Sequence, residues 1–412
     1  MSINLTPRYL VFVSNADNHN KYYKQIPNGD GTWTAEYGRV GSKPQKRVYS
    51  SSQYESKYRE KLAKGYVDQT HLMTDLIEKV ETKKSNEYKE IEDKSIAEIV
   101  QRLQDLAKKA ISDNYTVKAE AVTQAMVDNA QEILLKLTSI KTVPAFNKRL
   151  IDLFAVIPRK MSKVENYLAT KTDDFPKIIQ REQDLLDIMK GQIYKPEIKK
   201  EEKQDKPLND CTILEANGLI FEKCSPADIR KIKLALGESE HKFKNAWKVT
   251  NIETQRKFDE FVKTNDIKKK KLLFHGSRNE NWWSIINTGL KLKPTNVIIT
   301  GKLYGMGTYF APKAKKSIGY TSLSGSYWAG GNSSFGFMAL MDVAYGTPYD
   351  VYDFDSRYHR MDYNLLQTFK PGANCLHAHA GASMGYSSLR NDEIVVYKEE
   401  QCTIKYLVEI QN

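Results

Sequence analysis

Residues 272–320 read LLFHGSRNENWWSIINTGLKLKPTNVIITGKLYGMGTYFAPKAKKSIGY, and this stretch decides the fold of the chain. Its apolar start, residues 272–274, predicts a strand that leads directly into His275-Gly276-Ser277. A glycine after a strand lets a ligand approach the backbone closely. A loop punctuated by glycines follows at 300–307, and residues 308–311 predict a second strand. The two strands therefore predict the floor of a ligand site.

Polar and aromatic side chains accompany both strands. Pro312 suits the first turn of a helix after the second strand, because its missing N–H costs nothing there. On that helix Ser317 and Tyr320 are three residues apart and share a face. With His275 and Tyr309 they offer flat faces for a ring and polar groups that orient it, as in a nucleotide or nicotinamide site. Taken alone, each tyrosine also fits a place in the core.

These motifs in combination resemble the catalytic domain of the poly(ADP-ribose) polymerases. The motifs are the His-Gly-Ser triplet, the GxGxYFA segment at 305–311, the serine and tyrosine at fixed offsets, and NDEIVVY at 391–397. The resemblance covers roughly the last half of the chain and extends to the strand KYLVEI at 405–410.

The resemblance implies a reaction that uses NAD+ as substrate. The catalytic His, Tyr and Glu of that family fall on His275, Tyr309 and Glu393. Its nicotinamide-binding glycine, serine and stacking tyrosine fall on Gly276, Ser317 and Tyr320. Three residues next to the first motif complete the predicted NAD+ site, the last two on its adenosine side: Ser277, Arg278 and Asn281.

Glu393 is the predicted catalytic carboxylate. Breaking the bond between nicotinamide and ribose builds oxocarbenium character, which a nearby carboxylate stabilises. The family has Asn-Glu before its apolar strand, whereas this chain has Asn391-Asp392-Glu393. Asp392 is therefore a rival, but strand alternation and the count back from Lys405 favour Glu393.

Residues 1–75 predict a small β-rich domain. Strands are expected at 9–13, 21–26 and 33–40, with a hairpin turn at 28–31 and a helix from residue 51. Tyr37-Gly38-Arg39 makes the segment similar to a WGR domain, with tyrosine in the place of tryptophan. The resemblance implies DNA binding, and the predicted contacts are Tyr37, Arg39, Lys43, Lys46 and Arg47. The same residues also fit an ordinary strand with one packed and one solvated side chain.

Between residues 90 and 195 the apolar residues recur at helical spacing, which predicts an all-α bundle. Ser95 and Glu98 are expected to form a capping box at the first helix. The bundle resembles the helical regulatory domain of DNA-dependent family members. A charged linker with two prolines leads from it to a mixed-sheet domain at 207–412. The predicted fold class is therefore α+β with three domains.

Net charge, hydropathy and cysteine spacing indicate which kind of partner and which cellular compartment to expect. The 412 residues carry a formal charge of +12, which favours a polyanionic partner. No stretch reaches the length of a membrane span, and the N-terminus lacks the features of a signal peptide. The four cysteines show no metal spacing, which indicates a reducing, intracellular compartment. We expect the nucleus in a eukaryotic source and the cytoplasm otherwise.

Cys375, His377 and His379 form the one group of potential metal ligands that the sequence brings to notice. Alternation along a single strand explains their spacing, and no further ligand set appears in the sequence. No metal site is predicted.

The expected reaction transfers ADP-ribose from NAD+ to protein acceptors, including this protein itself, and extends poly(ADP-ribose) with release of nicotinamide. We expect DNA with strand breaks to stimulate it, and we expect a monomer. Mono-ADP-ribosyl transfer is an alternative, because Lys302 stands where polymerising relatives have an aromatic residue. A DNA-binding adaptor with an inactive transferase domain is a second alternative.

Overall fold

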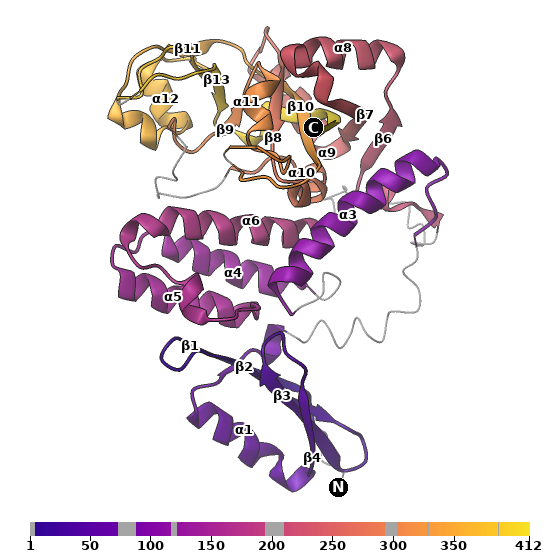
Figure 1. Cartoon of the computed structure of the whole chain (residues 1–412), viewed down its shortest axis with the longest axis vertical. Helices are drawn as coiled ribbons and strands as arrows, with labels where there is room; N and C mark the ends of the chain where they lie inside the picture. The colour runs from indigo at the N-terminus through magenta and orange to yellow at the C-terminus, as the bar shows by residue number, and fades with distance from the viewer. Residues whose placement is uncertain are drawn as a thin grey trace. The chain divides into compact units, whose positions relative to one another are not determined.

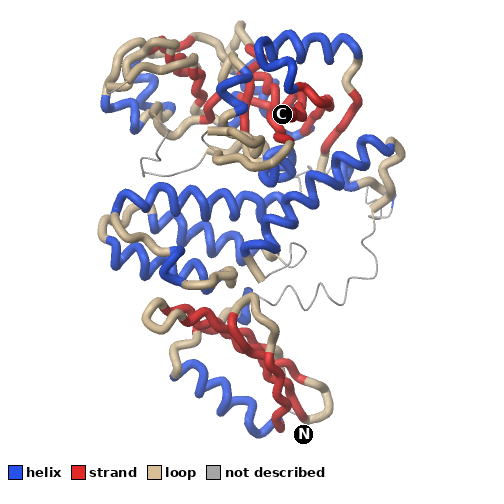
Figure 2. Tube along the Cα trace, in the orientation of Figure 1, coloured by secondary structure: helices blue, strands red, loops and turns tan. Residues whose placement is uncertain are grey.

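A computed structural model describes residues 5–72, 88–116, 122–193, 210–292, 303–327, 329–385 and 387–412. The chain forms two compact units, one of residues 1–85 with 108–193 and one of residues 86–107 with 194–412. Both units combine helices and strands (Figures 1 and 2). The predicted α+β class is confirmed.

A five-stranded antiparallel sheet in the order β4-β3-β2-β1-β5 opens the first unit. The first two strands contain the predicted strands at 9–13 and 21–26, and the third ends at Arg39, one residue before the predicted end. The turn at 28–31 joins the second strand to the third. The basic tract after Arg39 continues into an exposed edge strand. The elements are β1 (Arg8–Ser14), β2 (His19–Pro27), β3 (Thr32–Arg39), β4 (Gln45–Ser50), η1 (Ser51–Gln53), α1 (Tyr54–Ala63), β5 (Val67–Asp68) and η2 (Thr70–Leu72).

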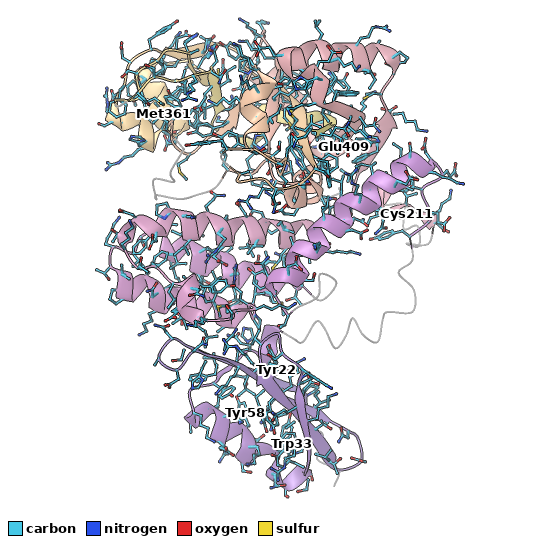
Figure 3. All side chains as sticks on the ribbon, viewed as in Figure 1. Tyr22, Trp33, Tyr58, Cys211, Met361 and Glu409 are labelled. Atoms are coloured by element: carbon cyan, nitrogen blue, oxygen red, sulfur yellow. The ribbon has the colours of Figure 1, made fainter. Side chains whose placement is uncertain are left out.

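Aromatic packing fixes α1 against one face of this sheet. Trp33 is fully buried, stacks on Tyr49 with ring centroids 4.8 Å apart, and meets the edge of Tyr54 at 5.4 Å. Its indole N–H donates to the carbonyl of Ser50 at 3.0 Å. Figure 3 labels Trp33 and Tyr58 in this layer. Large rings supply most of the burial that so small a sheet can offer.

The opposite face of the sheet packs on a helical segment of the same unit. Tyr9, Val11, Tyr22 and Val40 form one buried cluster with Ala155 of α5. The helices there are the end of α3 (Lys94–Asn114), α4 (Gln124–Leu137), α5 (Val143–Val156), η4 (Val164–Tyr167), η5 (Thr172–Asp174) and α6 (Phe175–Ile193). The predicted capping box at Ser95 is wrong. Asp93 caps α3 instead, and its carboxylate accepts from the backbone N–H groups of Ser95 and Ile96.

The second unit contains two sheets joined by one pair of backbone hydrogen bonds. The larger sheet has the order β6-β7-β14-β10-β8, and the smaller has the order β11-β12-β13-β9. Phe274 at the edge of the first sheet and Ala311 after the last strand of the second exchange bonds of 2.9 and 3.0 Å. The two sheets therefore meet where the predicted ligand site begins.

The strands of the second unit are β6 (Leu219–Lys223), β7 (Phe243–Asn251), β8 (Lys271–Gly276), β9 (Thr308–Phe310), β10 (Phe335–Val343), β11 (Pro348–Val351), β12 (Cys375–Ala378), β13 (Glu393–Val396) and β14 (Cys402–Gln411). Its helices are α7 (Ile213–Ala216), α8 (Pro226–Leu236), η7 (Gly237–Lys242), α9 (Ile252–Thr264), η8 (Asn279–Asn281), α10 (Trp282–Thr288), α11 (Ala314–Ile318), η9 (Ser356–Arg360), α12 (Tyr363–Phe369) and η10 (Glu399–Gln401). Among the described residues, no helix has the length and apolar character that crossing a membrane requires.

The first half of α3 belongs to the second unit, and ion pairs help to hold it there. Arg102 forms an ion pair of 2.8 Å with Glu409 of β14, whose side chain is 8% exposed. The guanidinium also lies over the rings of Phe335 and Phe337, 4.0 and 5.2 Å from their centroids. A buried carboxylate needs such a partner. Just before the helix, Asp93 forms a second ion pair, of 2.8 Å, with Lys223 of β6.

A buried ion pair in the helical segment provides a test of its packing. Arg159 pairs with Glu182, and each side chain is 2% exposed. We expect Arg159→Met to lower the free energy of unfolding by about 3 kcal/mol, because it leaves a buried carboxylate short of a partner. Urea denaturation followed by circular dichroism measures this.

Two controls separate lost pairing from lost volume. Arg159→Met combined with Glu182→Leu should recover most of the loss, since apolar groups can replace a whole buried pair. Lys136→Met removes an exposed partner of Glu132 and should change stability by less than about 1 kcal/mol. Equal losses in the two single variants would contradict the expectation.

Candidate active site

Three strands bring the predicted catalytic residues together. β13 lies between β12 and β9, with Val395 opposite Tyr309, and Glu393 is the first residue of β13. β8 carries His275 and meets the end of β9 through the Phe274–Ala311 bonds. The Nδ1 atom of His275 lies 3.0 Å from the carbonyl oxygen of Tyr309. The imidazole is therefore oriented by the backbone of the neighbouring sheet.

Gly276 allows the closest backbone approach at the site. A Cβ atom on Gly276 would lie 2.0 Å from the carbonyl oxygen of Ser317. Only glycine fits there, so the end of β8 and the helix α11 can pack directly against each other. The Ser317 side chain is 4% exposed. The glycine and serine predicted to hold the carboxamide are thus adjacent.

The Tyr309 hydroxyl organises the loop that precedes it. It accepts from the N–H of Tyr304 at 2.9 Å and donates to the carbonyl of Gly305 at 3.0 Å. Gly305 has φ +71°, and a Cβ atom there would lie 2.2 Å from the carbonyl oxygen of Met361, near α12 (Figure 3). Burial, and next the charge of Glu393, raise the pKa of Tyr309 well above its usual value, so its hydroxyl stays neutral.

Glu393 is a buried carboxylate with its two oxygens in different states. One oxygen pairs with the ammonium of Lys316, and the two side chains are 9% and 14% exposed. The other, Oε2, is buried and has no hydrogen-bond partner among the described residues. An unpartnered carboxylate oxygen is costly to bury, and one at the predicted catalytic site calls for an explanation.

Lys316 is the residue that the sequence analysis missed. It directly precedes Ser317 in α11, where two lysines in a row suggest only a solvated face. Nothing in the sequence distinguished Lys316 from its neighbour Lys315, because only the contact with the distant strand β13 gives it its partner. The pairing of Lys316 with Glu393 links α11 to β13, so the helix that carries the predicted nicotinamide serine is tied to the catalytic strand.

The predicted helix over Ser317 and Tyr320 is shorter than expected. α11 ends at Ile318, and the N–H of Tyr320 donates to the Ser317 carbonyl at 3.0 Å in a following turn. Pro312 lies two residues before the helix, whose N-cap is Lys313. Burial and the Glu393 charge raise the pKa of the Tyr320 hydroxyl to about 12. Its ring is partly exposed.

Ser277, Arg278 and Asn281, the predicted residues after Gly276, lie in a turn that side-chain hydrogen bonds hold in place. Asn281 donates from Nδ2 to the Ser277 hydroxyl at 2.9 Å, and Arg278 donates to the carbonyl of Ala329 at 3.1 Å. Asn279, which the motifs did not single out, anchors this turn to β10 through Phe335 and Phe337. The turn is therefore fixed independently of any ligand.

Asp392 is held in a different network from its neighbour. Its carboxylate lies 2.9 Å from Nε2 of His377 and accepts from the N–H of Ala380 at 2.9 Å. Burial acts to raise the pKa of Asp392, but these hydrogen bonds outweigh it and the pKa is lowered. Glu393 lies instead among tyrosines 304, 309 and 320, whose pKa values its charge helps to raise.

The predicted DNA contacts lie at one edge of the first sheet. Lys43 is in the exposed loop before β4, and Lys46 and Arg47 are exposed on that edge strand. Arg47 lies 5.1 Å from the ring centroid of Tyr49, and Lys46 lies 3.4 Å from Glu36. The ring of Tyr37 packs against that of Tyr23 at 6.0 Å. Charged residues also protect an edge strand from pairing with other chains.

Arg39 differs from the other members of this set. Its guanidinium donates to the carbonyls of Asn18, Met161 and Ser162 at 2.7, 3.0 and 2.7 Å. Asn18 in turn accepts from the N–H of Val164 at 2.9 Å. Arg39 therefore joins the sheet to the segment after α5 and has few donors left for a phosphate.

Comparison with known proteins agrees with this geometry. Residues 226–412 match the family profile of the poly(ADP-ribose) polymerase catalytic domain, and residues 6–73 match that of the WGR domain. "Putative poly [ADP-ribose] polymerase-like 100L" of Invertebrate iridescent virus 6 is 33% identical over 174 residues, or 41% of this chain and 86% of the viral protein. "Uncharacterized protein 101L" of the same virus is 31% identical over 234 residues, or 56% of this chain and 94% of that protein.

Cellular relatives match over smaller shares of their length. Poly [ADP-ribose] polymerase 2 of Arabidopsis thaliana is 26% identical over 169 residues, or 37% of this chain and 26% of the plant protein. Poly [ADP-ribose] polymerase 2 of Homo sapiens is 37% identical over 81 residues, or 20% of this chain and 13% of the human protein.

The fold and these matches define an ADP-ribosyltransferase that uses NAD+ as its substrate. The chain belongs to the poly(ADP-ribose) polymerase family and carries a WGR domain at its N-terminal side. Both family resemblances predicted from the motifs are confirmed. The two domains indicate nucleic acid and protein acceptors as partners, and the family favours an active enzyme over an inactive adaptor.

The close approach at Gly276 gives a test of the site. We expect Gly276→Ala to raise the KM for NAD+ strongly, because the new methyl group forces β8 away from the Ser317 carbonyl. Overpacking of this kind costs about 1–3 kcal/mol of stability. Steady-state kinetics with a thermal melt measure both effects.

Gly38→Ala is the matched control. A Cβ atom on Gly38 would meet its nearest neighbour at 3.8 Å, an ordinary contact. This variant should keep both the KM for NAD+ and the melting temperature. If the KM for NAD+ were unchanged in Gly276→Ala, Gly276 would not be part of the NAD+ site.

Proposed function

We propose that this enzyme transfers ADP-ribose to protein acceptors, itself included, extends the product into poly(ADP-ribose), and is stimulated by DNA strand breaks. The observation that carries the catalytic part is Glu393, which is buried, paired with Lys316 through one oxygen and unpartnered at the other. A carboxylate that is both fixed in place and able to accept a further hydrogen bond suits the activation of an acceptor hydroxyl.

The reaction breaks the bond between the nicotinamide nitrogen and C1′ of the ribose. Gly276 and Ser317 hold the carboxamide, Tyr309 and Tyr320 flank the ring, and His275 orients a hydroxyl of ADP-ribose. As nicotinamide leaves, positive charge develops at C1′ and the ring oxygen. The acceptor oxygen then bonds to C1′, and its proton passes to Glu393. The proposal needs no metal ion, because the carboxylate supplies the negative charge.

Glu393→Gln tests the assignment of the catalytic carboxylate. Glutamine keeps the shape but loses the charge, so chain elongation should fall by orders of magnitude while NAD+ binding changes little. Labelled NAD+ with separation of products by length measures elongation, and calorimetry measures binding.

Asp392→Asn is the matched control, since it removes the neighbouring charge from the other network. Its product lengths should remain close to those of the wild type. Long products from Glu393→Gln would exclude Glu393 as the elongation residue. Single ADP-ribose units from the wild type would favour the alternative, mono-ADP-ribosyl transfer. The Lys302 position, on which that alternative partly depends, lies outside the described residues.

The proposal that DNA breaks stimulate the enzyme rests on the exposed basic edge of the WGR sheet. Lys43, Lys46 and Arg47 offer phosphate contacts, and Tyr37 is the nearby aromatic residue. Phosphate contacts carry no sequence information, so recognition should follow the structure of the DNA end. Nicked plasmid should therefore stimulate NAD+ turnover, and closed circular plasmid should do so poorly.

Lys43→Ala combined with Arg47→Ala tests this edge. Loss of two phosphate contacts should weaken stimulation and reduce the salt dependence of DNA binding by about two units of slope. Fluorescence anisotropy of a nicked duplex over a range of salt concentrations measures the slope. Basal turnover without DNA should stay unchanged, because the residues lie outside the catalytic domain.

Two controls separate DNA contact from other effects. Lys231→Ala combined with Lys244→Ala removes the same charge from exposed positions of the second unit and should keep the slope. Arg39→Ala should weaken stimulation with little change in slope, because its donors already bond carbonyls. If closed and nicked plasmid stimulated NAD+ turnover equally, the enzyme would not recognise DNA breaks, and the basic edge would be ordinary solvent-exposed surface.

We further propose three domains, at 1–75, 90–195 and 207–412, in a monomeric enzyme. The helical domain would then regulate access to NAD+, as the family resemblance implies. The enzyme would act inside the cell, in the nucleus of a eukaryotic source or in the cytoplasm otherwise.

A further inference from the structure

Two histidines and an aspartate meet on the smaller sheet of the catalytic domain, apart from the NAD+ site. β11 and β12 are parallel, and their register places Asp350 opposite His377. His379 follows two residues later, on the same side of the chain. One oxygen of Asp350 lies 2.7 Å from Nε2 of His379 and 3.9 Å from Nδ1 of His377. One ligand atom from each residue lies within 4.8 Å of the other two.

We propose that Asp350, His377 and His379 bind a divalent transition-metal ion, for which Zn²⁺ is the best match. Zinc binds nitrogen and carboxylate oxygen at about 2.0–2.2 Å, so tetrahedral ligand atoms lie about 3.3 Å apart. The separations of 2.7 and 3.9 Å lie on either side of that value. The Asp350 side chain is 38% exposed, so its carboxylate can turn when an ion binds.

The surroundings of His377 are those of a metal ligand. Its nitrogen remote from Asp350, Nε2, lies 2.9 Å from the Asp392 carboxylate, which also accepts from the N–H of Ala380. A histidine that binds a metal through one nitrogen usually donates from the other to such a fixed carboxylate. The Tyr345 hydroxyl lies 2.8 Å from Nδ1, and metal binding would redirect it to the ion or to a bound water.

The ligand chemistry selects the class of ion. Two imidazoles and one carboxylate suit Zn²⁺ and its neighbours in the first transition row, whereas Mg²⁺ and Ca²⁺ prefer sets of oxygen ligands. Cys375 is not part of the set, because its buried thiol donates to the Tyr345 carbonyl. The His379 side chain is 26% exposed, so an ion can enter from solvent.

A bound ion would act on the structure and not on the reaction. It would tie β11 to β12 and, through Asp392, fix the residue that precedes Glu393. The proposal is independent of the proposed function, because it is tested without NAD+.

The test uses the full chain, stripped of metal with a chelator. Zn²⁺ is titrated into the protein against a chromophoric chelator, and we expect one equivalent per chain. Asp350→Asn and His379→Gln should each weaken this binding at least tenfold; both residues are accessible to solvent, which limits the risk of misfolding. Asp392→Asn should weaken it by about 10- to 100-fold without changing the stoichiometry.

His241→Gln is the matched control, because His241 is an exposed histidine elsewhere in the same domain. It should bind Zn²⁺ like the wild type, and Zn²⁺ should raise the melting temperature of both. With Co²⁺, the wild type should show ligand-field absorption without a thiolate charge-transfer band. No tight binding by the wild type, equal binding by Asp350→Asn and His379→Gln, or a thiolate band would overturn the proposal.

Discussion

The exchange of backbone hydrogen bonds between Phe274 and Ala311 is the constraint on which the catalytic unit depends. Each of the two sheets buries one of these residues, and the bonds between them hold the end of β8 beside the end of β9. Because backbone groups at a sheet edge must find partners, the joint satisfies both edges at once. The predicted site lies directly after it. His275 and Gly276 follow Phe274, and the short helix with Lys316 and Ser317 follows Ala311.

Burial of Glu393 beside this joint determines the electrostatics of the site. A carboxylate taken out of water needs compensation, and here one cation compensates one oxygen. Burial and the charge of Glu393 raise the pKa values of Tyr309 and Tyr320, so both hydroxyls stay protonated. The site thus holds a single anion in apolar and aromatic surroundings. In the proposed mechanism, charge that develops on the ribose is stabilised there more strongly than it would be in water.

The sequence predicted most helices and strands well, but it predicted poorly which distant side chains contact one another. Strands at 9–13, 21–26 and 308–311 were predictable because apolar alternation and turn residues are local signals. The end of α11 at Ile318 was missed, although Gly319, a residue type common just after a helix, follows it directly. Lys316 and Asp350 were missed for a different reason. Each is an ordinary charged residue in the sequence, and only pairing with a distant strand or histidine distinguishes it.

Asp392 and Glu393 show what the alternation of side chains along an extended segment can predict and what it cannot. Adjacent residues in an extended segment point to opposite sides, so two neighbouring carboxylates can enter separate environments. Asp392 joins the His377 network on one side, and Glu393 faces Lys316 and Tyr309 on the other. The rule predicts that the two differ, and the count along the strand predicts which of them is catalytic. It cannot predict what the second carboxylate does, because that depends on histidines from β12 and an aspartate from β11. A strand that carries the predicted catalytic carboxylate on one side can thus be held in position by a polar network on the other.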